Sequence, residues 1–263
     1  MSQRSAETLS KGPRFQLSKG LMTVLISTVV LFVLCGLIAP SSVSSGPLGS
    51  MIPFASILAI AGLGQMLVIQ QAGIDLSVPS AISLAAVIVT KMPQGDNEKL
   101  LPAVLTALGV AVLVGLLNGF LIGFLKLNPI IATLGTNALL FGCIMAITGG
   151  IPSSSSPLLL AVVSGLTFGV PNAAYFAGAI LLIVILALRR TVAGRRFESI
   201  GSSPAMASIS GLRVRIHHGM AYVWAQILYA IAGITIAGII TVSNAFMGDP
   251  YLLPSVAVVV LGG

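Results

Sequence analysis

The chain has 263 residues, of which 56% are hydrophobic and only 7% are charged, and its formal net charge is +7. A soluble domain carries about 25% charged residues to cover its surface, so this composition excludes a water-soluble globular fold. The basic residues do not interleave with aromatic residues along a face, which excludes a nucleic-acid-binding surface.

The positive charge is concentrated at two places. One cluster precedes the first apolar run, at Arg4, Lys11, Arg14 and Lys19. The other fills a central loop, at Arg189, Arg190, Arg195, Arg196, Arg213 and Arg215. Because Lys and Arg gather in cytoplasmic loops of membrane proteins, we expect both clusters, and hence the N-terminus, to face the cytoplasm.

Apolar runs long enough to cross a bilayer recur along the whole chain. An α-helix needs about 20 apolar residues for this, and lipid satisfies no open backbone groups, so the spans must be helical. The predicted spans are 21–39, 52–71, 78–92, 103–125, 130–149, 171–188 and 219–242. Six of them separate the two basic clusters, and this even number returns the chain to the same side.

Shorter segments complete the predicted topology. The stretch 157–168 is a candidate re-entrant segment, and the acidic connections at Asp96, Glu98 and Asp249 are expected outside the cell. The last run, 252–263, reaches only about 18 Å at 1.5 Å per residue, so we expect the chain to stop inside a span and to be truncated at its C-terminus.

The break between the second and third predicted spans carries the sole acid expected inside the membrane. Asp75 lies in the sequence QQAGIDLSVPS, where Gly73 and Pro79 interrupt two apolar runs and Ser77 adds a hydrogen-bonding group. A carboxylate here either holds a structural hinge by accepting backbone N–H bonds or binds substrate, and the hinge is favoured.

The fourth and fifth predicted spans carry small and polar residues at helical spacing. Gly115, Gly119 and Gly123 form a ridge on which another helix can pack closely, and Asn118 lies beside it. In LNPIIATLGTN, Asn128 is the predicted helix cap before Pro129. The polar residues of these segments either line a substrate pathway or bond between helices. The candidate pathway residues are Gln65, Asp75, Asn118, Thr133 and Asn137.

The central loop, 189–218, contains a short predicted helix. Ser203 is its expected cap, Pro204 begins it, and Gly211 follows its end. A nearly uncharged helix between arginines is typical of a docking element for a partner, although an interfacial helix on anionic lipid has the same pattern.

No motif for catalysis is visible. The chain lacks GxxxxGK[ST], a nucleophile elbow and a metal-spaced His cluster, so the sequence predicts neither an enzyme nor a metal or cofactor site, and ATP must be handled by another chain. Cys35 and Cys143 lie singly in apolar runs and indicate no disulfide framework.

Three segments resemble the permease subunits of bacterial ABC importers for ribose and related sugars, with branched-chain amino acid permeases as more distant relatives. GIDLSVPS at 73–80 is similar to the family's GIDLSVGS signature. NGFLIGFLKLNPIIATLGT at 118–136 and TVAGRRFESIGSSPAMASISGLRV at 191–214 resemble two further family segments in the same order. The resemblance implies an all-α polytopic transmembrane helical bundle in which seven to eight of about ten spans are present. The expected organisation is a cytoplasmic tail, 1–20, and one permease domain, 21–263.

The resemblance also implies partners. It places the protein in the bacterial inner membrane, with a second permease subunit, a cytoplasmic ABC ATPase subunit and a periplasmic sugar-binding protein, and without nucleic acid. The loop helix would then dock on the ATPase. The implied coupling residues are Arg195, Arg196, Glu198, Ser203, Pro204, Met206, Ile209, Ser210 and Gly211. Relatives tend to have GNxEAA where this chain has Ser202–Ala207, so its docking contacts differ.

Three other functions remain open at the level of the sequence, and the first is a branched-chain amino acid ABC permease. A secondary transporter or channel requires coupling charges within the spans or a repeated filter motif, and neither is visible. A structural membrane scaffold would share the packing glycines and polar caps of any helical bundle.

Overall fold

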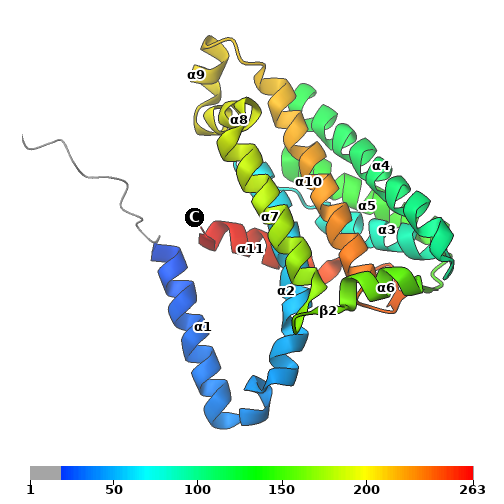
Figure 1. Ribbon diagram of the computed structural model, residues 1–263. Coiled ribbons are helices and arrows are strands. Elements are labelled where there is room, and N and C mark those ends of the chain that lie inside the picture. Colours follow the sequence, from blue (N-terminus) through cyan, green and yellow to red (C-terminus); the bar gives the residue numbers. More distant parts are fainter. Residues whose placement is uncertain (1–18, 263) are drawn as a thin grey trace, which may run out of the picture.

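The computed structural model describes residues 19–262, which form a helical bundle with only two short pairs of strands (Figure 1). The N-terminal tail, with Arg4, Lys11 and Arg14, lies outside the described residues. The α-helices are α1 (Lys19–Ile38), α2 (Ser45–Ile69), α3 (Val78–Lys91), α4 (Leu100–Gly119), α5 (Pro129–Thr148), α6 (Pro157–Ser164), α7 (Asn172–Arg190), α8 (Val192–Ser202), α9 (Pro204–Ile209), α10 (Val214–Ala237) and α11 (Leu252–Gly262).

Short elements connect these helices. Single 3-10 turns lie at η1 (Pro40–Val43), η2 (Asn97–Lys99) and η4 (Asp249–Tyr251), and α4 continues into a π-helix, η3 (Phe120–Phe124). Strand β1 (Ser153–Ser154) pairs antiparallel with β4 (Val242–Ser243), and β2 (Leu166–Thr167) pairs with β3 (Val170–Pro171). The β1–β4 pair therefore joins the segments that follow α5 and α10.

Six helical stretches of the described chain are long and apolar enough to cross a membrane: Gly20–Ile38, Ser45–Ile69, Asn97–Phe124, Pro129–Thr148, Asn172–Arg190 and Val214–Ala237. The predicted span 78–92 is instead the 14-residue α3, which is fully buried in the bundle and follows the irregular stretch 70–77. The predicted span 219–242 begins earlier, at Val214, because the helix continues into the basic loop. The segment 157–168 forms the short α6, which lies across one end of the bundle (Figure 1).

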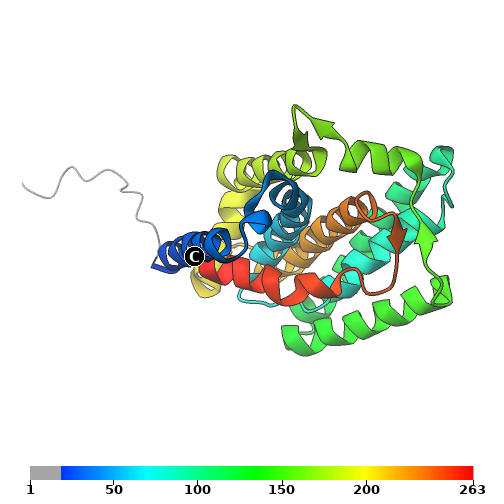
Figure 2. The ribbon, with the colours of Figure 1, turned by 90° about the horizontal axis from the view of Figure 1, so that it is seen from below.

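Helix α10 is the centre of the molecule and packs against α2, α3 and α4 (Figure 2). Tyr222 and Tyr229 on this helix are the largest fully buried side chains. Helix α1 is the opposite case, because none of the apolar residues in its span is buried in the described chain. A helix that is apolar all round and unburied by protein is suited to contact with lipid.

Glycines set the distance between α4 and α10. A Cβ atom on Gly115 would lie 2.5 Å from the Cα atom of Val223, and one on Gly119 would lie 2.6 Å from the carbonyl oxygen of Gly219. Gly123 approaches the Arg215 carbonyl in the same way, at 2.7 Å. The predicted glycine ridge is therefore confirmed as a packing surface, since the backbones meet where side chains are absent.

Helices α7 and α8 meet at a tight corner. Thr191 caps α8 by accepting a hydrogen bond at Oγ1 from the Gly194 N–H at 3.0 Å. A Cβ atom on Gly194 would come within 2.1 Å of the Leu188 carbonyl oxygen. Only glycine fits at this position, so α8 folds directly back against the end of α7.

The bundle has a basic end and an end of mixed charge. Helices α8 and α9 lie at one end with the central arginines, and η2, with Asp96, Glu98 and Lys99, lies at the other (Figure 1). The expected separation of Asp96 and Glu98 from the arginines is thus present in the structure. Asp249 does not lie with them, because the chain turns back after β4 and Gly248 packs against Pro79 at the start of α3.

Helix α11 then runs from the start of α3 towards the start of α1. The Gly248 N–H donates to Ser83 Oγ at 2.9 Å, which fixes the beginning of this segment. At its other end, the Leu261 carbonyl lies close to Gly20 of α1. Between these two points the final apolar run packs across α2, at a steep angle to it in Figure 1. Figure 2 shows its path from the far side of α10 to α1.

Candidate functional site

The five candidate pathway residues come together around the break between α2 and α3. Asp75 lies in the break itself, Gln65 on α2, Asn118 on α4, and Thr133 and Asn137 on α5. Except for the half-buried Asn137, each side chain is completely excluded from solvent. We call this group, with Ser77, Thr136, Gln226 and Tyr229, the break cluster.

Asp75 accepts hydrogen bonds at both carboxylate oxygens. Its Oδ1 accepts from the Ser77 N–H at 2.9 Å and from the Ser77 hydroxyl at 2.5 Å, and its Oδ2 accepts from Gln226 Nε2 at 3.2 Å. The expected bond from the carboxylate to a backbone N–H at a helix start is confirmed. A buried carboxylate with three donors is far less costly than one left without partners.

Ser77 joins four elements of the bundle. Its Oγ also accepts from Gln226 Nε2 on α10 at 2.7 Å and from Asn118 Nδ2 on α4 at 3.3 Å. Asn118 in turn accepts at Oδ1 from the Thr136 hydroxyl on α5 at 2.6 Å. One branch of bonds therefore runs from the break to α10, and a second runs from the break through α4 to α5.

Side chains of α5 satisfy the backbone of the break. The Leu76 N–H donates to Thr133 Oγ1 at 2.9 Å, and the Ser80 N–H donates to Asn137 Oδ1 at 3.2 Å. Asn128, the predicted cap of α5, accepts from the Ile130 N–H at 2.9 Å. Irregular backbone within a membrane requires such partners because lipid supplies none.

Gln65 and Tyr229 close the cluster from the other side. The Gln65 amide bonds the Tyr229 hydroxyl at 2.8 Å. In the orientation that satisfies both amide atoms, Gln65 also donates to the Asp75 carbonyl at 3.2 Å and accepts from the Asp75 N–H at 3.3 Å. Gln65 thereby holds the main chain of Asp75, while Ser77 and Gln226 hold its side chain.

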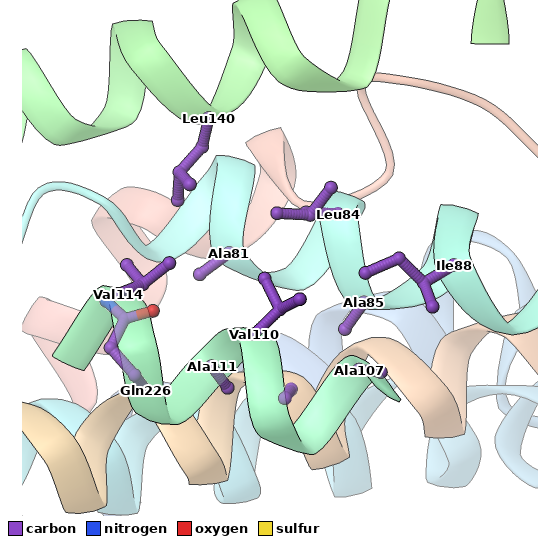
Figure 3. Close-up of a pocket in the computed structure, with 11 residues that line it drawn as sticks. Ala81, Leu84, Ala85, Ile88, Ala107, Val110, Ala111, Val114, Leu140 and Gln226 are labelled. Carbon is purple, nitrogen blue, oxygen red and sulfur yellow. The ribbon is translucent and has the colours of Figure 1, made fainter. Parts of the chain in front are cut away.

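A small cavity of about 10 Å³ lies beside the break cluster, between α3, α4, α5 and α10 (Figure 3). Its wall is apolar except for Gln226, and it includes Ala81, Ala111 and Leu140. This volume is at the lower limit for one water molecule. This cavity is therefore too small to admit a sugar-sized solute.

The predicted loop helix is α9, and its caps are those expected. Ser203 Oγ accepts from the Met206 N–H at 3.4 Å, Pro204 is the first residue, and Gly211 follows with a φ angle of +80°. The Leu212 N–H donates to the Ala207 carbonyl at 3.0 Å, which closes the helix end. Ser210 lies at this end and donates to the Met206 carbonyl at 3.0 Å.

The two large exposed side chains of α9 are apolar. Met206 is 63% exposed and Ile209 is 80% exposed, whereas Ala207 is buried against the rest of the chain. Arg195, Arg196 and Glu198 lie exposed on the neighbouring α8, a helix not expected from the sequence. Helix α9 therefore presents two large apolar groups next to charged ones at the basic end of the bundle.

Helix α8 is bonded directly to the first residues of the break, Gln70 and Gln71. Gln71 Nε2 donates to the Phe197 carbonyl at 2.9 Å. The backbones also touch, because a Cβ atom on Gly201 would lie 2.3 Å from the Gln70 carbonyl oxygen. This link between the basic loop and the α2–α3 break joins the two predicted sites.

Sequence reasoning missed Gln71, Gln226 and Tyr229. Gln226 had a detectable signal, because a polar amide inside the apolar run 219–242 requires a partner. Gln71 and Tyr229 could not be identified from the sequence, because a Gln at the end of a span and a Tyr within a span are common. Within the described residues, no group of His, Cys, Asp or Glu is placed to hold a metal ion.

The fold and the break cluster define a polytopic helical membrane protein with an interrupted helix pair at its core. Residues 48–263 match the family described as the branched-chain amino acid transport system permease component, so the chain belongs to that family of ABC-transporter permeases. No solved structure matches the chain.

Curated relatives agree with this assignment. A probable ABC transporter permease protein of Sinorhizobium fredii is 32% identical over 89% of this chain and 71% of its own length. The galactofuranose transporter permease protein of Escherichia coli K12 is 32% identical over 100% of this chain and 80% of its own length. The ribose import permease protein of the same strain is 29% identical over 91% of this chain and 76% of its own length.

Proposed function

We propose that this chain is the permease subunit of an ABC importer that moves a sugar or a related small polar solute into the cytoplasm of a bacterium. Its similarity to permeases named for galactofuranose and ribose supports a sugar. ATP hydrolysis by a separate ABC ATPase subunit drives transport, and a periplasmic sugar-binding protein delivers the solute. A second permease subunit completes the pore in the inner membrane.

The observation that carries the coupling role is the exposure of Met206 and Ile209 on α9. Large apolar side chains that project from the bundle near arginines are typical of a protein interface, where apolar anchors are surrounded by charge. The bond from Gln71 to Phe197 gives a direct route from this surface to the α2–α3 break. Two ATPase states that bind α9 differently would therefore bias two arrangements of the helices.

The break cluster acts in this proposal as a hinge rather than as the substrate site. Asp75 and Ser77 are fully buried and already satisfied by protein donors, and the adjoining cavity is about 10 Å³. A sugar would have to displace these bonds to reach them. The solute pathway is more readily formed between two permease subunits, at surfaces that are exposed in the single chain.

The coupling role is tested by the double variant Met206→Asp and Ile209→Asp, purified from its native membranes. We expect the ATPase to be lost from the purified complex while the permease is still inserted and folded. The matched control is Leu166→Asp with Phe168→Asp, since both side chains are exposed and lie on the β2–β3 hairpin at the opposite end of the bundle. Normal ATPase recovery with the α9 variant contradicts the docking assignment.

Uptake measurements distinguish a sugar substrate from a branched-chain amino acid substrate. Cells that lack the gene should lose uptake of one radiolabelled monosaccharide and regain it with the intact gene. Retention of sugar uptake with loss of leucine uptake would favour the branched-chain amino acids of the family description. Loss of uptake without any associated ATPase would instead favour a secondary transporter.

A further inference from the structure

A hollow of about 410 Å³ lies at the basic end of the bundle, beside α9 and separate from the break cluster. Met206 and Ile209, the large exposed side chains of α9, do not line it. Its apolar wall includes Phe124, Leu212 and Ile216, and its polar groups are Ser208, Arg213 and Arg215. The volume falls within the range of about 300–1,000 Å³ that is common for ligand pockets.

The hollow lies at the level where two spans terminate. Phe124 is the last residue of the span Asn97–Phe124, and Val214, between the two arginines, is the first residue of the span Val214–Ala237. The side of the hollow towards the bundle therefore faces the apolar layer, and the arginines lie at its boundary with water. Lipid headgroups occupy this level in a bilayer.

The two arginines have no anionic partner among residues 19–262. The single ion pair among residues 19–262 joins Lys99 to Asp96 at the opposite end of the bundle. No carboxylate lines the hollow, and Lys126 follows Phe124 by two residues and adds further positive charge. Arg213 and Arg215 are both exposed and line the same hollow, and a guanidinium group can bind a phosphate with paired N–H donors.

We propose that this hollow binds an anionic phospholipid. Arg213 and Arg215 contact the headgroup phosphate, and Phe124, Leu212 and Ile216 contact the glycerol and the first carbons of an acyl chain. Basic pockets at the cytoplasmic ends of spans have the charge and shape that such headgroups require. The proposal does not depend on the transport role, because lipid binding is measured on the permease alone.

Binding at this place would stabilise the end of the coupling loop. Ser208 belongs to α9 and Leu212 closes its C-terminal end, whereas Arg215 and Ile216 belong to α10. A lipid seated between them touches both elements. Its removal would therefore free α9 relative to α10 without changing any residue of the docking face.

The test measures lipid binding to the detergent-purified permease by native mass spectrometry. The probes are dioctanoyl phosphatidylglycerol, dioctanoyl phosphatidylcholine and glycerol phosphate. We expect phosphatidylglycerol to bind at least tenfold more tightly than phosphatidylcholine, and Arg213→Gln with Arg215→Gln to remove this preference. The control pair Arg189→Gln and Arg190→Gln changes the net charge equally at the end of α7, outside the hollow, and should change binding by less than twofold.

Three results would overturn the proposal. Equal binding of the two lipids would show that charge is not recognised. Equal weakening by the control pair would show that the attraction is a general effect of the basic loop. Binding of glycerol phosphate as tight as that of phosphatidylglycerol would identify a soluble phosphate site instead of a lipid site. Circular dichroism of each variant confirms that it has folded.

Discussion

At the scale of single residues, Asp75 is the group on which the core is most dependent. It is fully buried and accepts three hydrogen bonds, from the Ser77 N–H, the Ser77 hydroxyl and Gln226. Asp75→Asn replaces one acceptor oxygen by an NH₂ donor that faces existing donors. We expect a loss of about 1–3 kcal/mol in the free energy of unfolding and a lower yield of folded protein, measured by thermal unfolding in detergent.

The matched control for this variant is Asp96→Asn. Asp96 also accepts from a backbone N–H, that of Glu98 at 2.9 Å, but it lies on an exposed turn. Water can replace its contacts there, so we expect the unfolding midpoint to change little. Normal stability of Asp75→Asn together with a selective loss of transport would contradict the hinge role and place Asp75 in the solute pathway.

At the scale of elements, the contact between α4 and α10 depends on the absence of a single carbon atom. A Cβ atom on Gly119 would lie 2.6 Å from the Gly219 carbonyl oxygen, and backbone cannot move aside as a flexible side chain does. We expect Gly119→Ala to destabilise the protein by about 1–3 kcal/mol, even though Ala favours the helix. Chemical unfolding followed by the fluorescence of Trp224, on α10, measures the change.

Gly109 on the same helix provides the comparison. Nothing lies within 4 Å of a Cβ atom at this position, so Gly109→Ala tests helix propensity alone. We expect it to be neutral or slightly stabilising, since Ala is favoured over Gly in helices by about 0.5–1 kcal/mol. If both alanine variants behave alike, close packing of α4 on α10 does not limit stability.

At the scale of the whole molecule, charge orients the bundle. The arginines of α8 and of the segment before α10 lie at one end, and Asp96 and Glu98 lie at the other. With Cys35 and Cys143 replaced by serine, single cysteines at Ser202 and Glu98 should react with a membrane-impermeant maleimide from opposite sides. Labelling of Ser202→Cys in intact spheroplasts would contradict a cytoplasmic coupling loop.

The sequence predicts much of this structure because its strongest signals are local. Apolar length locates six long helices, Asn128 and Ser203 act as the expected caps, and the glycines of α4 form the expected packing ridge. It also identifies Gln65, Asp75, Asn118, Thr133 and Asn137 as polar groups inside apolar runs, and the structure brings all five together.

Other features depend on contacts between distant segments and were not predictable from local pattern. The bounds of α3 agree with the predicted segment 78–92 to within one residue, but the bonds from α5 that hold the Leu76 and Ser80 N–H groups were not predicted. The partner of Asp75 on α10 is 151 residues away. The turn of the chain after β4 likewise depends on Ser83, which is 165 residues from Gly248.

The close contact at Gly194 fixes the angle between α7 and α8. Because the Leu188 carbonyl occupies the space beside this glycine, α8 cannot rotate unless α7 moves with it. A displacement of α8 would therefore tilt the α7 span. It would also reach the core through the hydrogen bond from Gln71. A single movement of α8 would therefore displace α7 and the end of α2 together.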